Sequence, residues 1–160
     1  MTTTITAILP EDMHKLCARA LYDRCWEQAR RTDRTVEDDE ALLNMAHASL
    51  WHWRVVGLPV NLARGEWMLA RVNALLGLAE SARHHAENSL ALCDDHQLSE
   101  HDRALAHEAI ARACAIGSDP EGVASHVQYG LAAAGQVPDP SQREWVLRNL
   151  GSVTTDPPLD

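Results

Sequence analysis

The stretch GLAESARHHAENSLAL, residues 77–92, is the part of the sequence that most clearly indicates the fold. Its apolar residues recur at intervals of three and four, which predicts an amphipathic helix over residues 79–95. The break LLGLAE, which contains Gly77, separates this helix from an earlier one. Small residues recur along the helix at close intervals: Ala82, Ala86 and Ser89. The stretch therefore predicts a helix that follows another helix after a short turn.

Segments with the same periodicity lie on both sides of this stretch. They are separated by breaks rich in Pro, Gly and Asp, and they predict helices over residues 11–31, 36–56, 61–76, 99–116, 119–134 and 140–150. Thr35 and Ser99 precede acidic residues and suit helix N-caps. Pro120 and Pro140 suit first helical turns. No segment alternates convincingly between polar and apolar side chains, so the sequence predicts an all-α protein.

The composition is typical of one helical domain. Ala and Leu dominate the hydrophobic residues, which make up 46% of the 160-residue chain. A chain of this length buries about 70% of its unfolded surface without disulfides or metals. We expect a single domain over residues 11–150, with an N-terminal extension over 1–10 and a disordered tail over 151–160. The four cysteines form no Cys-x-x-Cys pair, so buried reduced thiols are expected.

The predicted helix pair around Gly77 resembles a tetratricopeptide (TPR) repeat. Ala70, in RGEWMLARVNALLG, stands at the small position of the first TPR helix, and the second helix carries the small residues quoted above. A weaker copy, HEAIARACAIGSDPEGVASHVQYGLAAAG, follows about forty residues later, with Ala111 at the position of Ala70. The usual TPR spacing is about 34 residues, so CDDHQLS is expected to form an extra loop. The resemblance covers about residues 62–135 and extends only loosely to the residues before them.

The resemblance implies stacked antiparallel helical hairpins that form a short superhelix of about seven helices. In TPR arrays the first helix of each hairpin lines the concave surface, where ligands bind. The groove positions carried over to this chain are, hairpin by hairpin, Trp26 and Arg30; Arg64, Trp67 and Arg71; Leu105, Glu108 and Arg112. Arginines beside aromatic rings suit a carboxylate or phosphate on an apolar or aromatic body. Another type of helical bundle remains an alternative.

A purely structural role for these residues also remains open. Arg71 could pair with Glu66, or it could stack on Trp67. Glu108 could neutralise Arg112, which lies one turn later on the same predicted helix. In that case the arginines would stabilise the fold and would not bind a ligand.

The heptad HASLWHW, residues 47–53, concentrates histidine and tryptophan on one predicted helix. One stripe of that helix, which includes Trp53, is expected to belong to the core. A second stripe has polar tips and is a candidate pocket wall: Asn44, His47, Trp51 and Arg54. We therefore take Asn44 and Trp51 as candidate ligand-binding residues. If the protein is an enzyme, His47 is its candidate acid or base.

Nine histidines raise the question of a metal site, and their spacing argues against one. His47 and His52 are five positions apart, which places them about 140° apart around a helix. No His-x-x-x-His pair and no HExxH motif is present. The P-loop, Gly-x-Gly-x-x-Gly and Gly-x-Ser-x-Gly motifs are absent as well. We predict no metal and no cofactor.

The formal net charge of −9 disfavours binding to nucleic acid or to an anionic membrane. The chain shows no signal peptide and no apolar run long enough to span a membrane, so a cytoplasmic protein is expected.

The function predicted from these features is a non-enzymatic module that binds a protein or peptide, including one with an acidic or carboxylate group, in an Arg/Trp-lined groove. One alternative is a small-molecule-binding or enzymatic helical protein that uses Arg64 and Arg71 as an anion clamp and His47 as acid or base. A second alternative is a structural helical domain that self-associates, for example as a homodimer.

Overall fold

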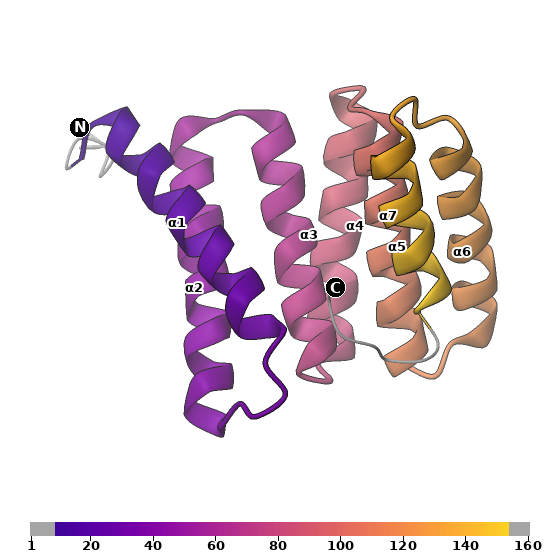
Figure 1. The fold of residues 1–160 in the computed structure, drawn as a ribbon, viewed down its shortest axis with the longest axis horizontal. Helices are drawn as coiled ribbons and strands as arrows, with labels where there is room; N and C mark the ends of the chain where they lie inside the picture. The colour runs from indigo at the N-terminus through magenta and orange to yellow at the C-terminus, as the bar shows by residue number, and fades with distance from the viewer. Residues whose placement is uncertain (1–8, 154–160) are drawn as a thin grey trace.

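The computed structural model describes residues 9–153, and every regular element in that range is a helix (Figure 1). The helices, in chain order, are α1 (Glu11–Ala29), α2 (Val36–Val56), α3 (Pro59–Leu75), α4 (Ala79–Asp95), α5 (Glu100–Ile116), α6 (Pro120–Gly135) and α7 (Pro140–Gly151). The predicted all-α class is confirmed.

Consecutive helices form three antiparallel hairpins that lie side by side (Figure 1). α1 packs on α2, α3 on α4, and α5 on α6. α3 also contacts both α1 and α5, so the first helices of the three hairpins adjoin on one side of the stack, here called the concave face. α7 packs against α5 and α6. This arrangement confirms the predicted stack of helical hairpins.

Local capping contacts begin several helices where the sequence predicts them. The Thr35 hydroxyl accepts a hydrogen bond from the Asp38 backbone N–H, and the Asp38 carboxylate accepts one from Thr35 N–H. This reciprocal pair satisfies donors that the first turn of a helix leaves unpaired. Ser99 caps α5 by accepting from the Asp102 N–H. α6 and α7 begin at Pro120 and Pro140.

The domain boundary differs from the prediction at the C-terminus. α7 continues to Gly151, and Val153 is 5% exposed, so the expected domain end at residue 150 is too early. The rest of the predicted tail and most of the predicted N-terminal extension, residues 154–160 and 1–8, lie outside the described residues.

The second and third hairpins repeat with a spacing of 41 residues. α3 and α5 begin at Pro59 and Glu100, and α4 and α6 begin at Ala79 and Pro120. The CDDHQLS segment is not the extra loop that we expected, because α4 continues to Asp95 and only a short link follows. The added length relative to a TPR unit therefore lies largely in long helices.

The first and second hairpins each contain the same kind of buried hydrogen bond between their two helices. The Ser49 hydroxyl of α2 donates to the Ala18 carbonyl of α1 at 2.8 Å, and the Ser89 hydroxyl of α4 donates to the Ala63 carbonyl of α3 at 2.8 Å. Both serines are buried. The shared contact aligns Ala18 of α1 with Ala63 of α3, at an offset of 45 residues.

Replacing Ser89 with alanine should lower the free energy of unfolding by about 1 kcal/mol, because a buried hydrogen bond to the Ala63 carbonyl is lost. Ser49→Ala should cost a similar amount. Urea unfolding measures both changes, with Ser81→Ala, at an exposed position of α4, as the control. Equal stability of the Ser81 and Ser89 variants would contradict a stabilising role for the hydroxyl contact.

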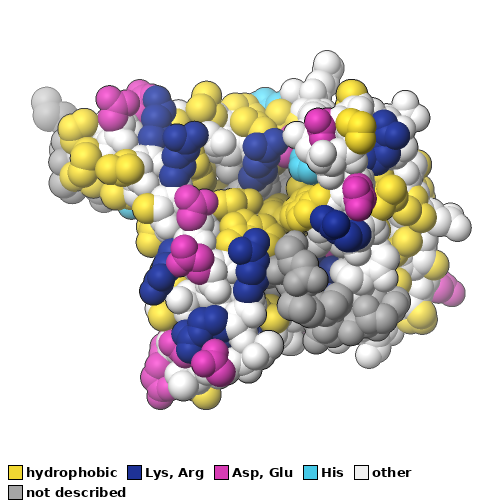
Figure 2. Space-filling model, in the orientation of Figure 1, with side chains coloured by type: hydrophobic (Ala, Val, Ile, Leu, Met, Phe, Trp, Pro, Cys, Tyr) yellow, Lys and Arg dark blue, Asp and Glu magenta, His cyan; other side chains and the backbone are white. Residues whose placement is uncertain are grey.

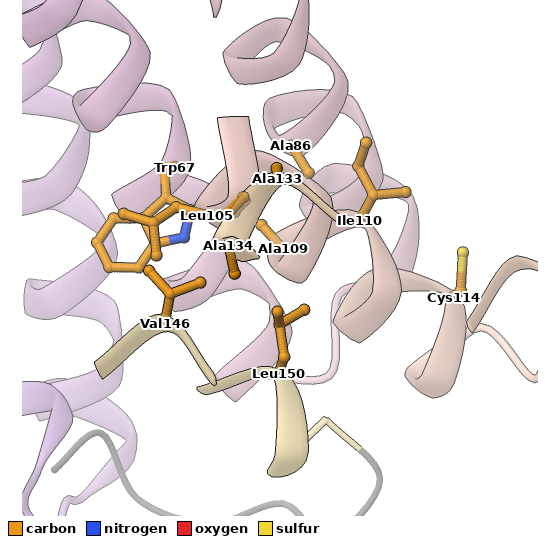
Figure 3. Packing of buried hydrophobic residues seen from close by; sticks show 12 residues of the cluster. Trp67, Ala86, Leu105, Ala109, Ile110, Cys114, Ala133, Ala134, Val146 and Leu150 are labelled. Carbon is orange, nitrogen blue, oxygen red and sulfur yellow. The ribbon is translucent and has the colours of Figure 1, made fainter. Parts of the chain in front are cut away.

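The core contains many small side chains, so the helices approach closely. One cluster joins α3, α4, α5, α6 and α7, and Figure 3 shows Trp67 and Leu105 lying close to Val146 of α7. A second cluster lies under α1, α2 and α3 and includes Leu42 and Leu69, both fully buried. Larger polar and aromatic side chains lie on the concave surface of α1 and α3, outside these two clusters.

Candidate binding cleft

α7 covers α5 on the concave face. Its residues Val146 and Leu150 are buried in the cluster that contains Trp67 and Leu105. The Trp145 ring lies 5.9 Å from the Trp67 ring, centroid to centroid. The groove that a TPR-like stack would present over its third hairpin is therefore filled by the protein's own last helix.

Beneath α7, Glu108 of α5 accepts hydrogen bonds from three side chains. Trp67 Nε1 donates to Glu108 Oε2 at 3.2 Å, and Arg71 and Arg112 both form ion pairs with Glu108 Oε1. Arg112 Nη2 also donates to the Asn149 carbonyl of α7 at 3.1 Å. Glu108 is 0% exposed, and Arg71 is 4% exposed. The group is a buried network in which one carboxylate pairs with two guanidinium groups.

These contacts decide where four of the predicted groove residues lie. Arg71 stacks over Trp67 at 5.9 Å and pairs with Glu108, while Glu66 pairs instead with Arg54 and His85. The side chains of Trp67, Arg71, Glu108 and Arg112 lie inside the protein. A ligand would reach them only after α7 had moved. They stabilise the packed fold, and two of their contacts, Arg71 with Trp67 and Arg112 with Glu108, are those of the structural alternative.

An open cleft of about 720 Å³ remains between α1 and α3. It is lined by Lys15, Arg19, Tyr22, Asp23, Trp53, Leu58, Asn61 and Arg64. Figure 2 shows a hollow near the middle of the concave face with hydrophobic side chains at its floor and Lys and Arg side chains beside it. The lining of the cleft combines apolar side chains and one aspartate with three basic residues, in a protein whose net charge is −9.

Arg64 is held in place at this cleft by a buried carboxylate. Its Nε and Nη2 donate to the two carboxylate oxygens of Asp102 at 2.6 and 3.3 Å. Asp102 is 4% exposed and also accepts from the Ser99 hydroxyl at 2.7 Å. The hydrogen bonds that Arg64 donates to Asp102 raise the pKa of Arg64 further above its ordinary value. The Arg64 side chain remains 47% exposed, so an oriented cation faces the cleft.

Arg19 lies on α1 at the position that corresponds to Arg64 on α3. It is exposed, and within residues 9–153 it has no hydrogen bond or ion pair with another side chain. Lys15, one turn earlier, pairs with Glu11 at 2.6 Å. The basic end of the cleft therefore contains one oriented arginine and one arginine without an internal partner.

Aromatic side chains form the opposite part of the concave face. Burial raises the pKa of Tyr22 to about 12, so this phenol is neutral at physiological pH and can donate a hydrogen bond. The Trp26 ring lies 5.3 Å from Trp67 and 6.5 Å from Trp145. Arg30 lies over Trp26, 5.9 Å from its ring centroid.

A second, smaller cleft of about 340 Å³ continues from this aromatic group. Its lining residues are Asp23, Trp26, Glu27, Arg30 and Trp145. It shares Asp23 with the larger cleft, so the two clefts adjoin on one surface. The predicted groove residues Trp26 and Arg30 thus lie on this surface.

The second stripe of α2 faces elsewhere. Asn44, His47 and Trp51 are exposed, and none of them lines either cleft. His47 lies beside His85 of α4, with their ring centroids 5.7 Å apart. The enzymatic alternative requires a pocket that joins His47 to Arg64 or Arg71, and neither of the two clefts does so.

Sequence reasoning missed Arg19, Tyr22 and Asn61 as cleft residues. A signal for the first two is present: ARALY, residues 18–22, matches ARGEW, residues 63–67, with arginine after alanine and an aromatic residue three positions later. The loose alignment of the first hairpin with the TPR pattern instead predicts Trp26 and Arg30 as its groove residues. The interval between the paired Ala and Ser is longer in the first hairpin, and this difference hid the register.

Across residues 9–153, no group of three or more His, Cys, Asp or Glu side chains is placed to hold a metal ion. Two histidine pairs do meet at helix interfaces. His14 Nδ1 lies 2.8 Å from His52 Nδ1, and His107 Nδ1 lies 3.1 Å from His126 Nδ1. None of the helices in this range is long and apolar enough to cross a membrane.

Comparison with protein-family models, curated proteins and solved structures found no match to this chain, so the resemblance to TPR repeats stays a prediction from the sequence.

Proposed function

We propose that the protein binds a peptide segment of a partner protein in the cleft between α1 and α3, with an acidic group of the peptide at its basic end. The observation that carries this proposal is the pair Arg19 and Arg64. These residues occupy corresponding positions on neighbouring first helices and line the same cleft.

The basic end is preorganised to receive an anion. Because Asp102 fixes the Arg64 guanidinium, little side-chain entropy is lost when a ligand pairs with its exposed side. Arg19 gains a charge partner that the described chain does not supply. Hydrogen bonds between ionised groups are the stronger class of hydrogen bond, which favours a carboxylate or phosphate at this position.

Two adjoining clefts favour a peptide over a compact small molecule. The clefts share Asp23, and the smaller one is lined by Trp26 and Trp145. Such a surface offers aromatic contacts to apolar side chains that follow an acidic residue. Helical-repeat proteins commonly bind extended segments on a concave face of this kind.

Arg19→Ala should weaken binding of a peptide selected against this protein by about 10- to 100-fold, since charged hydrogen bonds contribute about 1.5–3 kcal/mol. The peptide is selected from a displayed random library, and its affinity is measured by fluorescence anisotropy. Arg19 is exposed and forms no hydrogen bond or ion pair with another side chain within the described residues, so the thermal melt should change little.

Arg148→Ala is the matched control, because Arg148 is an exposed arginine on α7 that lines neither cleft. Its affinity should equal that of the wild type. Failure to select any peptide, or selected peptides that bind the Arg19 variant normally, would overturn the proposed site. Binding of small anionic molecules in this cleft, when the library yields no peptide, would support the small-molecule alternative.

A further inference from the structure

The repeat supplies an internal comparison for the basic end of the cleft. At the junction of the second and third hairpins, Arg64 of α3 pairs with Asp102 of α5 through two hydrogen bonds. Asp102 lies in the first turn of α5 and is buried. At this junction the chain provides both the cation and the anion.

The corresponding junction between the first and second hairpins has a different residue pair. The shared serine contacts place Arg19 at the position of Arg64. α3 and α5 start 41 residues apart and have equal lengths, which places Asn61 at the position of Asp102. An amide therefore stands where the next junction has a carboxylate.

This difference leaves Arg19 without the anion that its counterpart has. Arg19 is exposed, Asn61 is half-buried, and both line the same cleft. Asp23 lies one turn after Arg19 on α1, but no ion pair joins the two residues. The junction therefore has a cation and an amide donor that line one cleft, and among the described residues no carboxylate pairs with the cation.

We propose that Arg19 and Asn61 together bind the side-chain carboxylate of an aspartate or glutamate of the partner, in the place that Asp102 occupies beside Arg64. The Asn61 amide donates a hydrogen bond to one carboxylate oxygen, and Arg19 donates to the carboxylate as well. An aspartate at residue 61 would fill the site from within and repel the ligand. Asn61 is thus the residue that makes the cleft selective for acidic peptides. This inference rests on the proposed function.

The decisive variant is Asn61→Asp, with Asn61→Ala as its neutral counterpart. Asn61→Asp should weaken binding of the selected peptide at least tenfold, because the new carboxylate pairs with Arg19 and repels the peptide's carboxylate. Asn61→Ala should cause a clearly smaller loss, since it removes the amide donor without adding a charge. Asn61→Asp should fold normally, since the new group has a partner, and circular dichroism checks this.

The peptide is tested in three forms: unmodified, with its C-terminus amidated, and with its acidic residues replaced by the corresponding amides. We expect the peptide whose acidic residues are replaced by amides to lose affinity, and the C-terminally amidated peptide to bind with unchanged affinity. Loss on amidation alone would identify a C-terminal carboxylate and overturn the side-chain assignment.

An NMR titration provides a readout that does not depend on the selected peptide. Acetate added to the ¹⁵N-labelled full chain should shift the Asn61 side-chain amide signals, and Arg19→Ala should abolish the shift. If Arg19→Ala weakens peptide binding while Asn61→Asp does not, the proposed cleft stands and the inference about Asn61 is wrong. If neither variant changes peptide binding, both fail.

Discussion

Replacing Glu108 with glutamine should lower the free energy of unfolding by about 3–5 kcal/mol, the largest effect expected from a single neutralising change in this protein. Glutamine has nearly the same shape as glutamate, so the loss comes from charge and not from a cavity. The change leaves Arg71 and Arg112 buried without the carboxylate that compensates them. Urea unfolding followed by circular dichroism measures the difference.

Glu144→Gln is the control for this prediction, since Glu144 pairs with Arg148 in an exposed ion pair on α7. It should change the free energy of unfolding by less than about 0.5 kcal/mol. Adding Arg112→Gln to Glu108→Gln should restore part of the lost stability, because one buried uncompensated charge is removed. A Glu108 variant as stable as the Glu144 variant would show that the network is not what holds α7 on α5.

Acidification from pH 6.5 to pH 4 should destabilise the protein by about 3 kcal/mol through His107 alone. Burial lowers the pKa of His107 from 6.5 to about 4, and the charges of His126 and Arg103 act in the same direction, while Asp94 opposes them. The unfolded chain therefore binds a proton at a higher pH than the folded chain does. Stability is lost as pH falls below 6.5, and the loss from this group levels off below pH 4, where the folded form is also protonated.

The environment of His107 explains this shift. It lies on α5 against two α6 side chains, His126 and Tyr129, with ring centroids 5.3 and 5.5 Å away. Burial lowers the pKa of His126 as well, so a second proton at this interface is also disfavoured. Protonation should therefore loosen the α5–α6 contact.

Thermal melts of the wild type and of His107→Gln across this pH range test the prediction. The variant should lose much of the pH dependence between 6.5 and 4, whatever its stability at neutral pH, and His84→Gln, at an exposed site, should retain it. Parallel pH profiles for wild type and His107→Gln would contradict the assignment.

Glu66 acts at lower pH: burial alone would raise its pKa, but hydrogen bonds from His85 and Arg54 outweigh burial and lower it below 4.5. Its contribution is lost only as pH falls below that value.

The extent of the helices could be predicted because the signals that begin and end them are local. Thr35 and Ser99 bond to backbone groups three residues away, and Pro120 and Pro140 restrict their own backbone. The small errors have local causes that the periodicity does not reveal. α3 begins at Pro59 because proline suits the first helical turn, and Arg34 ends α1 early by donating to the Ala29 carbonyl.

The binding surface was only partly predictable, because it depends on which segments meet. Helical spacing correctly places Arg64, Trp67 and Arg71 along one side of α3, but their different environments follow from α7. That helix covers Arg71 and leaves Arg64 at an open cleft. Nothing in residues 140–151 read alone indicates that Trp145 would reach Trp26, which is far away in sequence.

The sequence by itself determined the helical class, the helix positions and the pairing of helices into hairpins, because periodicity, caps and short links act between near neighbours. Tertiary structure alone decided which charges are compensated. Glu108 is buried under α7 and pairs with two arginines, whereas Arg19 and Asn61 line the same open cleft. Charge compensation depends on distances between side chains from different hairpins, and those distances are set by the register and packing of the whole stack.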